Sequence, residues 1–163
     1  MSFPGTMVFE SEPDRECWHE AGHAVVAHHF GMTVLAIGFS WPSGLNGEPY
    51  PSSWIPIDGF DKEQVAVELF AGMAAELLKL GDHDVTARKS DVHQWQGLGC
   101  VSPPEHYISN ATDILKQRDA ALMRVHERLM QERVKPSYEK FQDTVDHMWK
   151  LRHLTHEDFE ALM

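Results

Sequence analysis

The chain has 163 residues, 42% hydrophobic and 24% charged, a balance that fits one folded domain and excludes a disordered tail. The net charge of -11 disfavours contact with the phosphate backbone of a nucleic acid. No apolar run approaches the roughly 18 residues of a membrane span, and two cysteines make no disulfide framework, so we expect no membrane span and a reducing, cytoplasmic location.

The N-terminal region predicts one helix after a short tail. Residues 1–10 are expected to form a flexible N-terminus. The helix is predicted to begin between Ser11 and Asp14, since Pro13 suits a first helical turn and acidic side chains suit its positive end. Gly31, a residue that often adopts the left-handed conformation after a helix, is expected to end it.

Two strands are predicted in the following segment. Residues 33–39 are apolar and partly β-branched, which indicates a strand. Prolines and glycines then predict a long turn, and residues 53–57 a second strand. Pro56 cannot donate a ladder hydrogen bond, so this strand is expected at a sheet edge.

A second helix is predicted from Asp61, because Gln64 stands three residues later in a capping-box arrangement, and Gly81 is expected to end it. Residues 82–108 are polar and irregular, with one short helix expected to open at Ser90.

The C-terminal third is predicted to be helical. We expect helices over 110–134 and 138–151, separated by Pro136, and a short last helix capped by Thr155. A stripe on the first of these packs it onto a neighbour or provides a face for a homo-oligomer; it consists of Leu115, Leu122, Leu129 and Met130. The predicted fold class is mainly α (α+β), with a small β-sheet or hairpin.

The first helix contains the sequence His-Glu-Ala-Gly-His at residues 19–23. Residues four apart lie on one side of a helix, so His19 and His23 can bind the same metal ion. Zinc in catalytic sites takes three protein ligands and keeps one open position. Glu20 can then accept a proton from a zinc-bound water, whose pKa falls to about 7, and the attack would fall on a peptide carbonyl.

The surroundings of this motif favour a metal site over a chance pattern of exposed polar residues. Ala21, Gly22 and Ala24 are small, which allows another element or a substrate backbone to approach closely. The following stretch, residues 24–27, is apolar, which indicates a buried helix. We therefore interpret the motif as the centre of a helical, zincin-type metalloprotease domain with one Zn2+.

The third ligand must come from elsewhere in the chain. His29 lies six residues after His23, but a continuing helix turns it away, and His28 is also badly placed. Acidic and histidine side chains further on are the remaining candidates: Glu68, Glu76, Asp82, His83, Asp84, Asp91 and His93. The residues alone leave the choice between Glu76 and Asp91 open.

Three segments, in order, resemble the peptidase domain of the FtsH-type ATP-dependent zinc metalloproteases. They are His-Glu-Ala-Gly-His-Ala at 19–24, Ala-Gly-Met-Ala-Ala-Glu-Leu at 71–77, and the stretch from Thr86 to Asp91. The terminal Leu-Thr-His-Glu-Asp-Phe at 154–159 is also similar to the closing helix of that family. The resemblance extends over about residues 11–163.

The resemblance implies a single metallopeptidase-like domain over 11–163, with a zinc-site half at 11–108 and C-terminal helices at 109–163. It implies that His19, His23 and Asp91 bind zinc and that Glu20 is the general base. Glu76 would be a structural residue that orients a ligand histidine. The strand at 53–57 would be the place where a substrate adds as an extra strand.

The chain departs from that family in having neither a phosphate-binding Gly-Lys-Ser/Thr loop nor a transmembrane helix. An ATPase or unfoldase would therefore be a separate partner. Arg88 and Lys89 replace small residues that precede the family's aspartate. The sequence favours a zinc endopeptidase acting on flexible or unfolded protein; the alternative is a catalytically silent binding or regulatory module that retains the scaffold.

Overall fold

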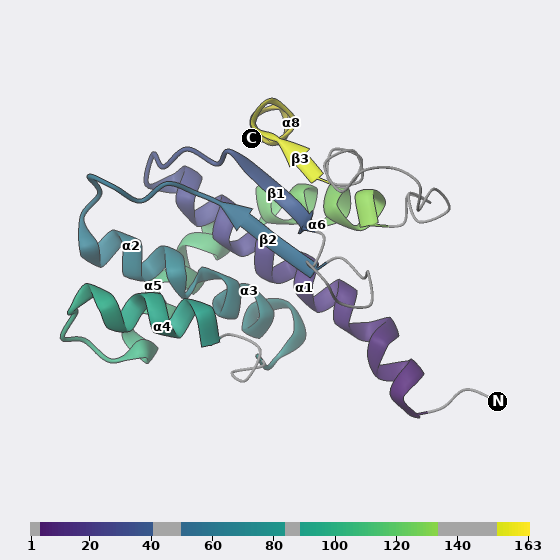
Figure 1. The fold of residues 1–163 in the computed structure, drawn as a ribbon, viewed down its shortest axis with the longest axis horizontal. Coiled ribbons are helices and arrows are strands. Elements are labelled where there is room, and N and C mark those ends of the chain that lie inside the picture. Colours follow the sequence, from purple (N-terminus) through teal and green to yellow (C-terminus); the bar gives the residue numbers. More distant parts are fainter. Residues whose placement is uncertain (1–3, 41–49, 84–88, 134–152) are drawn as a thin grey trace.

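The computed structural model describes residues 4–40, 50–83, 89–133 and 153–163. It confirms the predicted fold class, because it is mainly helical with one small antiparallel sheet (Figure 1). The elements in chain order are α1 (Pro4–His29), β1 (Ala36–Ser40), β2 (Tyr50–Trp54), α2 (Lys62–Leu69), α3 (Ala71–Leu80), α4 (Lys89–Leu98), α5 (Pro104–Gln117), α6 (Asp119–Arg133), β3 (His153–Thr155) and α8 (His156–Leu162).

Helix α1 is longer than the sequence predicts. It begins at Pro4, so the predicted start near Ser11 is wrong, and residues 4–10, predicted as a flexible N-terminus, are helical. The prediction placed Pro13 in a first turn, because a proline inside a helix removes a backbone hydrogen bond and crowds the preceding turn, but here the helix continues through it. The predicted end is confirmed, since Gly31 follows α1 with a φ of 79°.

The sheet has the strand order β2-β1-β3, and both pairs are antiparallel. The second strand is an edge strand, as predicted, but it covers Tyr50–Trp54 rather than 53–57. Pro56 therefore lies beyond the strand, whereas Pro51 lies inside it. The third strand, only three residues long, was not predicted, because so short a segment has no detectable alternation.

The predicted helix from Asp61 to Gly81 is two helices. Asp61 caps α2, and its carboxylate accepts hydrogen bonds from the backbone N–H groups of Glu63 and Gln64. The chain then bends at Phe70, where α2 ends and α3 begins. Gly81, with a φ of 85°, ends α3 as predicted.

The C-terminal helices also differ from the prediction in their bounds. In place of one helix over 110–134, α5 and α6 meet at Arg118, whose backbone leaves the helical region. The first of them already begins at Pro104, a favoured residue in a first helical turn, inside the segment expected to be irregular. The predicted helix over 138–151 lies outside the described residues.

Two further predictions in this region agree with the structure. Thr155 caps α8 with a complete capping box that includes Asp158. In the predicted stripe, Leu115, Leu122 and Leu129 are fully or almost fully buried.

Helix α1 occupies the centre of the molecule and contacts the sheet as well as α2, α3, α5 and α6 (Figure 1). The close approach of α1 and α3 depends on Gly22, where an added Cβ would lie 2.5 Å from the carbonyl oxygen of Ala71 and 2.7 Å from Cβ of Ala75. The small residues of the motif therefore serve helix packing. The backbone of α3 comes to lie directly beside the ring of His19.

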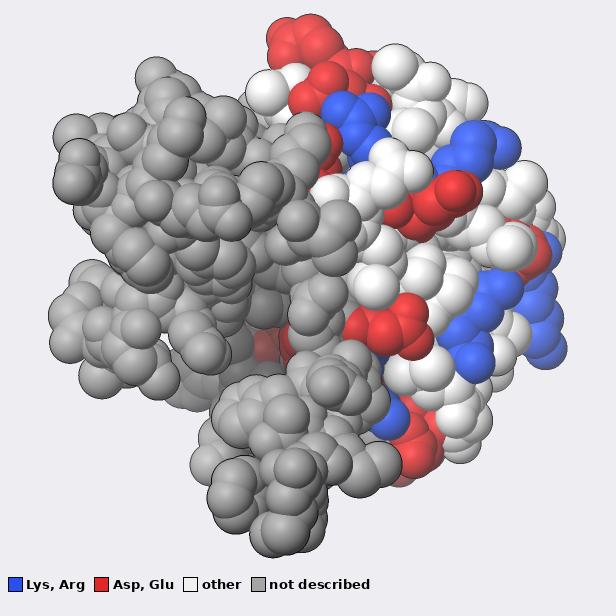
Figure 2. All heavy atoms as spheres, turned by 90° about the vertical axis from the view of Figure 1, so that its right-hand side faces the viewer, with Lys and Arg blue, Asp and Glu red and all other residues white. Residues whose placement is uncertain are grey.

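Acidic and basic side chains are interspersed over the described part of the face that Figure 2 shows. The excess of negative charge does not form a single-sign surface there. None of the helices in the described ranges is long and apolar enough to cross a membrane.

Candidate metal centre

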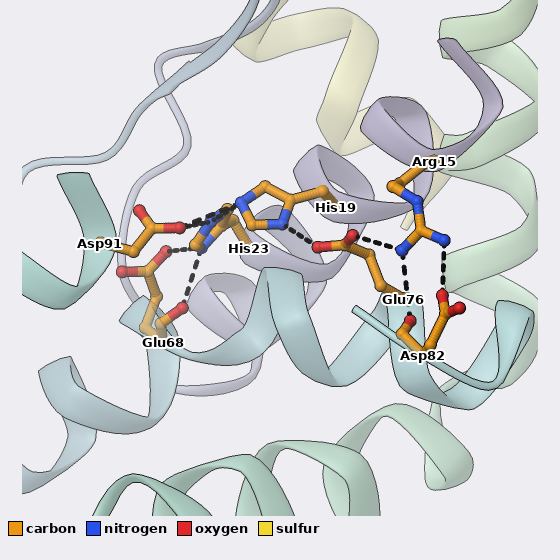
Figure 3. A network of polar contacts seen from close by, with 7 residues as sticks. All are labelled: Arg15, His19, His23, Glu68, Glu76, Asp82 and Asp91. Atoms are coloured by element: carbon orange, nitrogen blue, oxygen red, sulfur yellow. Dashed lines mark hydrogen bonds and ion pairs between the residues drawn. The ribbon is translucent and has the colours of Figure 1, made fainter. Parts of the chain in front are cut away.

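Helix α1 brings His19 and His23 together, and the first turns of α4 bring Asp91 to them (Figure 3). Nε2 of His19 lies 2.9 Å from Nε2 of His23. Oδ2 of Asp91 lies 3.0 Å and 3.2 Å from these two nitrogens. The histidines are buried and Asp91 is partly buried, so three ligand atoms converge on one point from two helices far apart in the sequence.

The opposite nitrogen of each imidazole faces a buried glutamate. His19 donates from Nδ1 to Oε2 of Glu76, on α3, at 2.8 Å. His23 donates from Nδ1 to the carbonyl oxygen of Glu68, on α2, at 2.9 Å. The side-chain Oε1 of Glu68 lies 3.1 Å from the same nitrogen. Carboxylate and carbonyl oxygens only accept hydrogen bonds, so each histidine carries its proton on Nδ1.

This tautomer leaves both Nε2 atoms with a bare lone pair. They face each other and the carboxylate of Asp91 at hydrogen-bond distance, although none of the three atoms then has a proton to share. Three converging acceptors repel one another unless a cation lies among them. The arrangement therefore calls for a metal ion or for extra protons on the histidines.

The pKa values of His19, His23 and Asp91 also favour a positive charge at this point. Burial and the neighbouring His23 lower the pKa of His19, but hydrogen bonds with Asp91 and Glu76 outweigh them and raise it. Burial likewise opposes protonation of His23, yet Asp91 and Glu68 raise its pKa well above the ordinary value. Burial acts to raise the pKa of Asp91, but the two histidines hold it well below its usual range.

The residues present fit zinc. Zinc bonds to nitrogen and oxygen of about 2.0–2.2 Å in a tetrahedron place neighbouring ligand atoms about 3.3 Å apart, close to the observed 2.9–3.2 Å. Two histidines and one carboxylate form a catalytic type of ligand set, which leaves a fourth position for water or substrate. Glu68 and Glu76 supply the carboxylates that usually orient zinc-binding histidines.

Glu20 lies beside this cluster without binding to it. The residue is 7% exposed, and its Oε2 atom is buried with no hydrogen-bond partner among the described residues. Burial raises the pKa of Glu20 above its ordinary value. The two histidines and a hydrogen bond with Ser53, on β2, act to lower this pKa but do not offset the effect of burial. A buried carboxylate with a free oxygen and a raised pKa is suited to accept a proton near neutral pH.

The remaining candidates do not reach the convergence point. Asp82 binds Arg15 instead, and His83 and His93 are not among the grouped ligands. His29 contacts Arg118 and points away, as expected from the helix geometry. Asp84 lies outside the described residues.

The structure places both Glu76 and Asp91 at His19, on opposite nitrogens of one ring. Sequence reasoning did not find the pairing of Glu68 with His23, nor the involvement of Arg15 and Ser53. Glu68 and Glu76 lie eight residues apart. This spacing would have indicated that both carboxylates face the histidines only if the bend at Phe70 had been known.

No protein-family model matches this chain, and a comparison with curated proteins likewise gives no match. The similarity to FtsH-type peptidase domains therefore rests on the motifs quoted above. The site geometry is the independent observation on which a function can be argued.

Proposed function

We propose that this protein is a zinc-dependent metalloendopeptidase, related to FtsH-type peptidase domains, that hydrolyses peptide bonds of flexible or unfolded proteins. The observation that carries the proposal is the convergence of His19, His23 and Asp91 beside the buried carboxylate of Glu20, whose Oε2 has no hydrogen-bond partner among the described residues. A structural zinc site would be closed by four protein ligands, usually including cysteine. Here three ligands converge, and the adjacent group is a base.

His19 and His23 would bind zinc through Nε2, and Asp91 through Oδ2. When bound there, the ion would act as a Lewis acid that polarises a peptide carbonyl and would lower the pKa of a bound water toward neutral. Glu20 takes that proton at Oε2 and passes it to the nitrogen of the leaving amine as the peptide bond breaks. The water oxygen ends in the new carboxylate and its protons end on the products, so the reaction needs no other reactant.

The edge strand β2 supports an extended substrate. It pairs with β1 on one side and with no other strand among the described residues, so backbone groups on its outer edge can pair with a peptide. Ser53 joins this strand to Glu20. Only a flexible or unfolded segment can adopt the extended form that such pairing needs, and a folded substrate would require a separate unfoldase partner.

The test is cleavage of an unfolded model protein by the purified, zinc-loaded chain, with Glu20→Gln as the matched control. Glutamine keeps the size of Glu20 but cannot take the proton, so we expect zinc binding to persist and hydrolysis to fall by about 100-fold or more. Zinc content by atomic emission and product formation by mass spectrometry give the two readouts.

Cleavage that disappears in the variant while zinc is retained would support the proposal. Equal cleavage by both proteins would point to a contaminating protease and would overturn the assigned role of Glu20. Zinc binding without cleavage in either protein, with several unfolded substrates, would overturn the enzyme proposal in favour of a silent binding module.

A further inference from the structure

Arg15 lies on α1 one turn before His19, on the side that faces α3 (Figure 3). Its Nη1 atom donates to Oε1 of Glu76 at 2.9 Å. Its Nη2 atom donates to the carboxylate of Asp82, and Nη1 also reaches the carbonyl oxygen of Asp82 at 3.3 Å. One guanidinium thus connects the buried glutamate behind His19 to the residue that follows the end of α3.

Glu76 needs this partner. Its side chain is 0% exposed, and a buried carboxylate is costly unless it is paired and hydrogen-bonded. Its two oxygens have different tasks, since Oε1 accepts from Arg15 and Oε2 accepts from His19. Because both oxygens belong to one planar carboxylate, the position of Oε2 depends on what binds Oε1.

The orientation of His19 depends in turn on Oε2 of Glu76. The hydrogen bond at Nδ1 sets both the tautomer and the direction in which Nε2 points toward His23 and Asp91. Among the residues that the structure describes, Glu76 is the hydrogen-bond partner of Nδ1 of this ring. A shift of the Glu76 carboxylate would therefore move a proposed metal ligand.

We propose that Arg15 is a positioning residue of the metal centre, which holds Glu76 so that His19 presents Nε2 to the ion. This inference rests on the proposed metal site but not on hydrolysis. Arginine suits the position because its planar fork can bind two carboxylates at once, whereas a lysine ammonium is a single point charge on a flexible stem.

The experiment measures the dissociation constant for Zn2+ by competition with a chromophoric chelator, at a temperature where every metal-free variant is folded. Arg15→Met removes the guanidinium and keeps an apolar stem, and we expect the affinity to fall by about 10- to 100-fold. Arg15→Lys should recover part of this loss. Arg124→Met is the matched control, because Arg124 lies on α6 and donates its hydrogen bond to the carbonyl oxygen of Leu162, near the C-terminus.

Two further readouts separate positioning from general stability. In a Glu76→Gln background, Arg15→Met should lower the affinity by about twofold or less, because the two residues act through one contact. The visible spectrum of the Co2+-substituted protein should change in Arg15→Met and stay the same in Arg124→Met.

Zinc affinity in Arg15→Met equal to that of the parent would overturn the inference while the metal site and the proposed function stand. An equal loss in Arg124→Met, or full additivity with Glu76→Gln, would also overturn it by showing a general effect. A parent protein that binds no zinc, with Asp91→Ala as the reference for ligand loss, would overturn both the inference and the proposed function.

Discussion

At the scale of single residues, the His19 imidazole is held by its face as well as by its nitrogens. Gly72, in the first turn of α3, lies against the ring, and a Cβ added there would overlap Nδ1, Cε1 and Nε2. Gly72 has an ordinary helical backbone, which any residue can adopt, so its conformation does not demand a glycine. A side chain is excluded here because the His19 ring fills the space.

Replacement of Gly72 by alanine is expected to displace the ring and weaken zinc binding by about 10-fold or more, an effect comparable to loss of an orienting contact. The change would otherwise favour the helix, since alanine is about 1 kcal/mol better than glycine in a helix interior. Zinc affinity by chelator competition and the midpoint of thermal unfolding without metal should therefore be measured together.

Gly97→Ala provides the control on another helix. A Cβ at Gly97 meets nothing within 4 Å, so this change should stabilise α4 by about 0.5–1 kcal/mol and leave zinc affinity unchanged. Unchanged affinity in Gly72→Ala would show that the ring adapts and would refute the steric argument.

At the scale of elements, the sequence predicted what periodicity can reveal. Histidines four residues apart share a helix face whatever the rest of the fold does, and the caps at Asp61, Gly81 and Thr155 follow from local chemistry. The breaks at Phe70 and Arg118 were missed because neither site has a glycine or proline. At Phe70 the break accompanies tertiary packing, since this side chain is buried and its ring contacts those of Trp95 and Tyr107.

The residues alone left the choice between Glu76 and Asp91 open for a related reason. Which nitrogen of His19 each carboxylate meets depends on how α3 and α4 lie around α1, and this is a tertiary property. Glu68 shows the same limit, since its place beside His23 depends on the bend between α2 and α3.

The position of α4 is set mainly by its contact with α2 and by Trp95, which lies one turn after Asp91 and whose ring centroid is 5.3 Å from that of Phe70. Trp95→Ala should remove this anchor, lower the free energy of unfolding by about 3 kcal/mol, and weaken zinc binding because Asp91 is less firmly placed. Denaturant unfolding and zinc titration would measure the two effects.

His93→Ala, at an exposed position of the same helix, is the control and should change neither quantity. If Trp95→Ala destabilised the fold but bound zinc as tightly as the parent, Asp91 would not depend on this anchor.

At the scale of the whole molecule, the proposed ligands join segments far apart in the sequence, and such a site does not exist in the unfolded chain. Zinc binding should therefore add to the stability of the fold. At a free zinc concentration 100 times the dissociation constant, the gain is about 2.7 kcal/mol. For a chain of this size, removal of zinc by a chelator should lower the unfolding midpoint by roughly 5–10 °C.

This difference should grow as the pH rises. The pKa values of His19 and His23 are raised in the metal-free fold, so their protonated forms stabilise that fold at low pH and lose this contribution as the pH rises through the raised values. Zinc needs both imidazoles unprotonated, so it binds better in the same direction. Calorimetry should show a larger chelator effect at pH 8 than at pH 6, and the opposite trend would contradict the ligand assignment.

The attachment of α4 also has a kinetic consequence. His19 and His23 are rooted in the central helix, whereas Asp91 sits on a helix held mainly by α2 and one aromatic cluster. Local opening of α4 would release one ligand while the other two stay in place, and the ion could enter or leave by that route. Amide hydrogen exchange in residues 89–98 would then slow sharply when zinc binds, and the exchange lifetime of this single helix would set how long the ion stays.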